Sequence, residues 1–105
     1  MAGRYYAKKT RVDGYLFDSK MEARRYEQLK LLERAKTIER LAVHPKWEIN
    51  LDKTWICDVE MDFSYMENGK VVIEDVKGHD NVLSKLKRRL FEAKYGLQVT
   101  VVKQV

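Results

Sequence analysis

The sequence predicts a mixed α/β (α+β) fold in which two helices pack on one mixed sheet. Three observations predict it. Two segments carry apolar residues at helical spacing, and the segments between them alternate apolar and polar residues, as strands with one buried face do. Two dipeptides typical of tight β turns, Asp13-Gly14 and Asn68-Gly69, separate short β-prone runs. The order of these segments predicts a hairpin, a helix, three strands, a second helix and a last strand.

The first elements are predicted to be a small N-terminal β-hairpin and a helix. The hairpin covers residues 10–17 and turns at Asp13-Gly14. The helix is capped by Asp18 or Ser19 and extends to about Lys36, because good helix formers dominate this segment. Its apolar residues at helical spacing are Met21, Tyr26, Leu29 and Leu32.

Three strands are predicted in the middle of the chain, as a meander. Residues 43–51 alternate apolar and polar side chains, with Pro45 near the start of the strand or on an edge. Residues 58–66 and 70–77 follow. Residues 81–95 then show helical spacing again, with Gly96 as a C-terminal stop, and residues 97–102 form the last strand. A chain of 105 residues buries enough surface for one core, so residues 1–105 are predicted to be one domain.

Composition excludes several classes of protein. The longest uncharged stretch, residues 95–102, is far too short to cross a bilayer. The start of the chain lacks the apolar run of a secretory signal, and a lone Cys57 cannot form an internal disulfide, so we expect a cytoplasmic protein. One cysteine and two histidines argue against a structural zinc site, and His44 and His79 are expected to be loop or strand-edge residues.

Charge is distributed unevenly along the chain. Residues 1–40 carry 11 basic and 6 acidic side chains (+5), residues 41–77 carry 4 and 8 (−4), and residues 78–105 carry 6 and 2 (+4). Basic flanks suit a polyanion such as nucleic acid, and a carboxylate cluster beside phosphates is stable mainly with a bridging cation. The alternative is that these charges are ordinary solvated surface.

The Asn68-Gly69 turn predicts that two carboxylates lie opposite each other. A two-residue type I′ loop pairs Asp62 with Asp75, and places Lys77 on the same face. Such a pair needs a cation, a shared proton or full solvation, and Mg²⁺ or Mn²⁺ answers this need best because both prefer oxygen ligands.

The position of Asp75 depends on that loop. A three-residue bulged loop would instead place Asp62 opposite Glu74. With the two-residue loop, Glu74 points to the opposite face and is interpreted as structural.

Glu22 is a candidate third ligand. It lies on the helical stripe of Tyr26 and Leu29, near the inward face, where a carboxylate needs a partner. The alternative is a capping box, in which Glu22 satisfies a backbone N–H group near Ser19.

Asp62 and the run Glu74-Asp75-Val76-Lys77-Gly78 resemble the Asp…(Asp/Glu)-x-Lys signature of the PD-(D/E)XK nuclease superfamily, with Met61 where a proline is usual. The likeness covers nearly the whole chain. Residues 13–23, 44–47 and 85–96 resemble a short phage-borne branch of that superfamily, known as a family of unknown function.

The resemblance implies a restriction-endonuclease-like core of helix, three-strand meander, helix and strand. Carried over residue by residue, it implies that Glu22, Asp62 and Asp75 bind Mg²⁺ (or Mn²⁺) and that Lys77 is catalytic beside them. It further implies a metal-dependent endodeoxyribonuclease, structure-specific for junctions or branched DNA, in phage recombination or replication. The protein would then act in a bacterial host cell. Cutting both strands needs two active sites, which favours a homodimer.

Basic residues near both ends of the chain are expected to contact DNA phosphates. They are Lys85, Lys87, Arg88, Arg89 and Lys94 in the second helix, and Arg4, Lys8, Lys9 and Arg11 near the N-terminus. Two alternatives to a DNA nuclease remain open: a non-catalytic basic DNA-binding regulator or architectural protein, and a nuclease of the same core that acts on RNA.

Overall fold

A four-stranded mixed sheet lies at the centre of the protein, in the strand order β3-β6-β7-β8. The computed structural model describes residues 8–105. The strands are β3 (Glu39–Val43), β6 (Phe63–Glu67), β7 (Lys70–Val76) and β8 (Val99–Val102). Strand β6 runs antiparallel to both β3 and β7, and β8 runs parallel to β7. The predicted α+β class is therefore confirmed.

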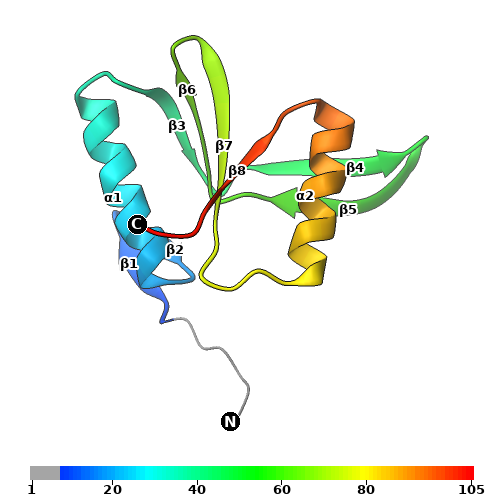
Figure 1. The fold of residues 1–105 in the computed structure, drawn as a ribbon, viewed down its shortest axis with the longest axis horizontal. Helices are drawn as coiled ribbons and strands as arrows, with labels where there is room; N and C mark the ends of the chain where they lie inside the picture. Colours follow the sequence, from blue (N-terminus) through cyan, green and yellow to red (C-terminus); the bar gives the residue numbers. More distant parts are fainter. Residues whose placement is uncertain (1–7) are drawn as a thin grey trace.

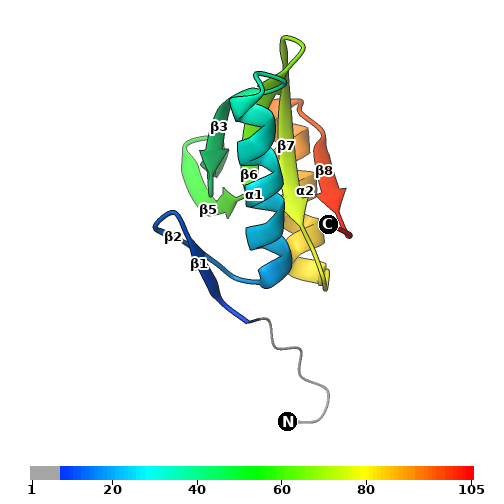
Figure 2. The same cartoon turned by 90° about the vertical axis from the view of Figure 1, so that its left-hand side faces the viewer.

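Helices cover the two faces of this sheet (Figures 1 and 2). On one side lies α1 (Lys20–Arg34), beside the hairpin of β1 (Thr10–Val12) and β2 (Tyr15–Phe17). On the other side lie α2 (Val82–Tyr95) and the hairpin of β4 (Lys46–Leu51) and β5 (Thr54–Glu60). Figure 2 shows α1 in front of β6 and β7, with α2 behind them. Within residues 8–105, no helix is long and apolar enough to cross a membrane.

Buried side chains form two clusters rather than the single core expected from chain length. The cluster around α1 contains Tyr26 and Phe63, and the cluster around α2 contains Ile73 and Phe91. Strand β7 contributes side chains to both clusters, because successive side chains of a strand point to opposite faces of the sheet. Ile73 packs towards α2 and Val76 packs towards α1.

The predicted helix ends are confirmed, because they depend on local chemistry. Ser19 caps α1, and its Oγ accepts a hydrogen bond of 3.0 Å from the Glu22 amide. Asn81 caps α2 in the same way, through the Ser84 amide. Gly96 ends α2 in the left-handed region, at φ 68°. The first helix ends at Arg34, slightly before the predicted Lys36.

Both predicted tight turns are also confirmed. Asn68 and Gly69 have φ values of 53° and 76°, as a type I′ turn requires, and the turn pairs Phe63 with Glu74. The alternative three-residue bulged loop, which would have placed Asp62 opposite Glu74, is therefore wrong.

The predicted three-strand meander has the correct order, but its first two strands bend and each divides into two. Residues 43–51 break at His44-Pro45, and residues 58–66 break at Met61-Asp62. The two chains stay paired across the bend: the His44 amide donates to the Asp62 carbonyl at 2.9 Å, and the Met61 amide donates to the Pro45 carbonyl at 3.0 Å. Pro45 has no N–H group to donate, and His44 has φ 54°, so a regular strand cannot continue here.

This bend changes which residues share a face. A straight strand would place Val59, Met61, Phe63 and Tyr65 on one apolar face. In the structure Val59 and Met61 pack with α2, whereas Phe63 and Tyr65 pack with α1. The bend therefore divides one predicted apolar face between the two clusters.

Candidate metal centre

Three elements bring polar side chains together at one end of the sheet. They are the first turn of α1, the bend at Asp62 and the C-terminal end of β7. A pocket of about 240 Å³ opens there. It is lined by Asp18, Ser19, Glu22, Asp62, Val76, Lys77, Gly78 and His79.

Asp62 lies at the centre of this group, one residue before β6. Its amide donates to the Glu74 carbonyl at 3.1 Å, and its Oδ2 accepts a hydrogen bond of 2.6 Å from the Val76 amide. Burial and the neighbouring carboxylates of Glu22 and Asp75 raise the pKa of Asp62 to about 9, although the Val76 hydrogen bond opposes this rise. A site that disfavours a negative charge so strongly gains when a cation is present.

Glu22 is 4% exposed and points into the same group. Its Oε1 lies 2.7 Å from Nε2 of His44. Burial raises the pKa of Glu22, and the contact with His44 opposes that rise. Glu22 lies beside the other carboxylates, as predicted. Its side chain contacts His44, whereas the contact with Ser19 at the helix end is made by the backbone amide of Glu22.

One ligand atom each from Glu22, His44 and Asp62 lie within 4.8 Å of one another, a spacing suited to a metal ion. The imidazole of His44 was not predicted as part of the site. At the bend, a backbone hydrogen bond places His44 beside Asp62. The alternation of apolar and polar residues over 43–51 does not predict that bend.

Asp75 lies on β7 and faces α2, and Lys77 is the first residue after that strand. Asp75 is 5% exposed; its Oδ1 lies 3.5 Å from Nζ of Lys77, and its Oδ2 accepts from Nη1 of Arg88 at 3.0 Å. Lys77 also lines the pocket that contains Glu22 and Asp62. The structure therefore brings the four predicted catalytic residues together, with Lys77 between the two sides of the group.

Arg88 does not occupy the surface position predicted for it. It is 9% exposed, and its guanidinium binds the carboxylates of Asp75 and Asp80. The hydrogen bond from Arg88 lowers the pKa of Asp80. A guanidinium bound to two carboxylates is not available to a phosphate. Helical spacing turns Arg88 towards β7, whereas the next residue, Arg89, is exposed.

The other predicted phosphate contacts remain at the surface. Lys8, Lys9, Arg11, Lys85 and Arg89 are exposed, and Lys87 is half-buried beside Asp75. Lys94 donates to the Glu48 carbonyl at 3.2 Å. Arg4 lies outside the described residues.

Glu74 points away from Asp75, as predicted. Both of its carboxylate oxygens bind Arg25 of α1, at 2.8 and 2.7 Å, and the Tyr65 hydroxyl donates to it. Glu74 is 1% exposed. These contacts attach α1 to β7 and keep Glu74 out of the metal-ligating group.

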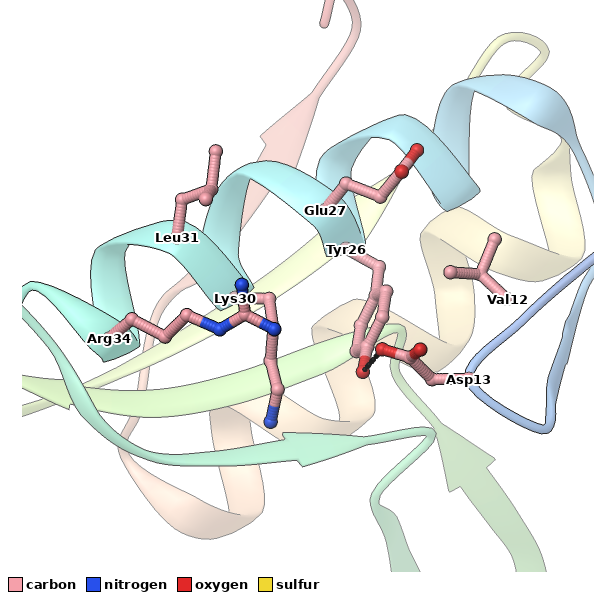
Figure 3. Close-up of a pocket in the computed structure, with 7 residues that line it drawn as sticks. All are labelled: Val12, Asp13, Tyr26, Glu27, Lys30, Leu31 and Arg34. Carbon is pink, nitrogen blue, oxygen red and sulfur yellow. Dashed lines mark hydrogen bonds between the residues drawn. The ribbon is translucent and has the colours of Figure 1, made fainter.

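A second hollow, of about 250 Å³, lies between the β1-β2 hairpin and α1 (Figure 3). The Tyr26 hydroxyl donates to Asp13 across it at 2.8 Å. None of the residues that line this hollow belongs to the Glu22, His44 and Asp62 group. The hydrogen bond between Tyr26 and Asp13 instead holds the hairpin turn against α1.

Asp62→Asn is expected to raise the free energy of unfolding of the metal-free protein at pH 8 by about 1–2 kcal/mol. The amide needs no proton, and its oxygen can still accept from the Val76 amide. A carboxyl whose pKa is raised by folding contributes stability that is fully present below its ordinary pKa and is lost as the pH rises to about 9.

The gain from Asp62→Asn should therefore be larger at pH 8 than at pH 5, in urea unfolding curves of metal-free protein. Asp52→Asn, in the exposed β4-β5 turn, is the matched control and should change stability by less than about 0.5 kcal/mol. A loss of stability for Asp62→Asn at both pH values would contradict the expectation that the buried Asp62 carboxyl destabilises the metal-free protein at high pH.

Comparison with known proteins gives one match. A family model described as Protein of unknown function (DUF1064) matches residues 2–104, which is nearly the whole chain. No curated protein and no solved structure matches the chain.

Proposed function

We propose that this chain, which belongs to the DUF1064 family of proteins of unknown function, is a metal-dependent endonuclease of the PD-(D/E)XK type that hydrolyses phosphodiester bonds of DNA. One observation carries the proposal. Glu22, Asp62, Asp75 and Lys77, which are far apart in the sequence, converge from α1, the strand bend and β7. Asp75 and Lys77 lie at the C-terminal end of β7, beside the carboxylates of Glu22 and Asp62.

The donor set fits a divalent cation. Carboxylate oxygens are the ligands that Mg²⁺ and Mn²⁺ prefer, and both ions commonly retain several waters beside a few protein ligands. Glu22, Asp62 and Asp75 would hold the ion. The raised pKa of Asp62 supports this assignment, because a cation relieves the repulsion among the carboxylates.

A bound ion would polarise the scissile phosphate and make a water molecule more acidic. The chain itself supplies orientation. The Val76 amide fixes the Asp62 carboxylate, and Arg88 binds one oxygen of Asp75 so that the other faces Lys77. The ammonium of Lys77 then donates to a phosphate oxygen or positions the attacking water.

The surface beside the site supports a nucleic-acid substrate. Lys87 of α2 lines one pocket with Asp75 and Lys77 of the site, and the same helix carries Lys85 and Arg89. Lysines and arginines contact phosphates regardless of base sequence. We therefore propose selection by DNA shape, with junctions or branched DNA as substrate, by a homodimer in phage recombination or replication in the host cytoplasm.

The test is a cleavage assay on linear, flapped and four-way DNA, and on matched RNA, with Mn²⁺, with Mg²⁺ and with EDTA. We expect cleavage of branched DNA with a divalent ion, none with EDTA, and none by Asp62→Asn, the variant expected to be more stable than wild type. DNA bound but not cut in any ion would favour a non-catalytic DNA-binding protein. Cleavage of RNA alone would overturn the DNA assignment.

A further inference from the structure

We propose that His44 is a ligand of the metal ion and that the site therefore prefers a first-row transition ion, with Mn²⁺ as the probe, over Mg²⁺. This inference rests on the metal-dependent function proposed above, and it adds a ligand and an ion class that the carboxylates alone do not specify. The imidazole of His44 would join the carboxylates already assigned, next to Glu22 and Asp62, with which it forms one group.

The distances suit one shared ion. Nε2 of His44 lies 2.7 Å from Oε1 of Glu22, and the ligand atoms of all three residues lie within 4.8 Å of one another. Ligands about 2.1 Å from one ion lie at most about 4.2 Å apart. No pair in the group therefore needs to approach by more than about 0.6 Å.

The backbone holds His44 at this position. Its amide donates to the Asp62 carbonyl at 2.9 Å, so a change in the placement of one ligand would disturb the other. His44 has φ 54° although it precedes Pro45, a combination that costs free energy and occurs mainly where the surrounding structure enforces it.

Packing fixes the imidazole ring as well. The Phe17 ring lies 5.5 Å from it, centroid to centroid, and Phe17 is fully buried. The His44 side chain is 28% exposed, so the ring contacts Glu22 and Phe17 but keeps part of its surface open to solvent. This is the arrangement expected of a pre-formed ligand.

The chemistry of the donors favours a transition ion. Mg²⁺ takes oxygen ligands almost exclusively, whereas an imidazole nitrogen suits first-row transition ions. The carboxylates of Glu22 and Asp62 bind either class. A site that includes His44 therefore discriminates in favour of Mn²⁺ and its neighbours in the series.

The test is pulsed electron paramagnetic resonance of Mn²⁺ bound to tag-free protein, which detects a directly coordinated ¹⁴N nucleus. The chain contains two histidines, so two variants assign the signal. We expect nitrogen modulation in wild type and in His79→Asn, and none in His44→Asn. Asparagine is the chosen replacement because it tolerates a positive φ.

Calorimetry provides a second readout. The dissociation constant for Mn²⁺ should rise roughly tenfold or more in His44→Asn. Mutation of a residue that only orients a metal ligand already weakens metal binding by about this factor, and loss of the ligand itself should weaken it at least as much. The dissociation constant for Mg²⁺ should change much less. If His44→Asn fails to fold, wild type labelled with ¹⁵N-histidine replaces it, and the modulation should shift to the ¹⁵N frequency.

The two proposals fail separately. Mn²⁺ that binds without nitrogen modulation, or with modulation that persists in His44→Asn, would overturn the role of His44, even if the protein cuts DNA. Modulation that depends on His44, in a protein that cuts no nucleic acid, would support the ligand and overturn the nuclease function.

Discussion

Lys77→Ala is expected to lower the rate of DNA cleavage by at least about 100-fold, since a positioned group that moves or holds a proton contributes this much or more. Nζ of Lys77 lies 3.5 Å from Asp75 and beside the pocket of Glu22 and Asp62. Its loss leaves Asp75 bound to Arg88, so the fold should persist. Single-turnover cleavage of branched DNA with Mn²⁺ measures the rate.

Lys70→Ala is the matched control for this variant. Lys70 lies on the same strand, at its exposed start, opposite Glu67. Lys70→Ala removes one positive charge, as Lys77→Ala does, but at a position outside the site. The rate of DNA cleavage should therefore stay within about twofold of wild type. A Lys77→Ala rate as high as that of Lys70→Ala would exclude a catalytic lysine.

Arg88→Met is expected to lower the free energy of unfolding by about 3 kcal/mol, because it leaves carboxylates without their buried partner. Asp75 is 5% exposed and receives Nη1 of Arg88 at 3.0 Å, while the rest of the guanidinium binds Asp80. Burial is costly for a carboxylate that keeps only the more distant ammonium of Lys77, at 3.5 Å. Urea unfolding at pH 7 measures the loss.

The matched control is Arg89→Met, because Arg89 is the next residue of α2 and is exposed. Its effect should be below about 0.5 kcal/mol. The double variant Arg88→Met with Asp75→Asn should recover part of the loss, since it removes the stranded charge as well. An Arg88→Met protein as stable as Arg89→Met would show that the ion pair contributes nothing.

Local chemistry explains what could be predicted from the sequence. Ser19, Asn81 and Gly96 mark helix ends through bonds to residues at most four positions away, and Asn68-Gly69 sets its own turn. The register of β6 with β7 follows from that turn. That register predicted a direct pair of Asp62 with Asp75. In the structure the ladder ends at Phe63 with Glu74 and the Asp62 amide donates to the Glu74 carbonyl, although the Asp75 carboxylate is still close enough to raise the pKa of Asp62.

The unpredicted features depend on contacts between distant segments. The bend at His44 is stabilised by pairing with Asp62, which lies on another strand, so the alternation of residues 43–51 favoured one straight strand. Arg88 is a basic residue on an amphipathic helix, and only the packing of α2 against β7 decides whether it meets solvent or Asp75. Sequence patterns identify such residues without fixing their partners.

Two successive residues of β7 hold the two helices from opposite sides. Glu74 binds Arg25 of α1, and Asp75 binds Arg88 of α2. Glu22 lies one turn before Arg25, so the length of the Glu74 side chain sets how far the first helix stands from the strand and thereby where Glu22 meets Asp62. A shortening such as Glu74→Asp, at a residue that does not line the pocket, would consequently alter ion affinity without changing any ligand.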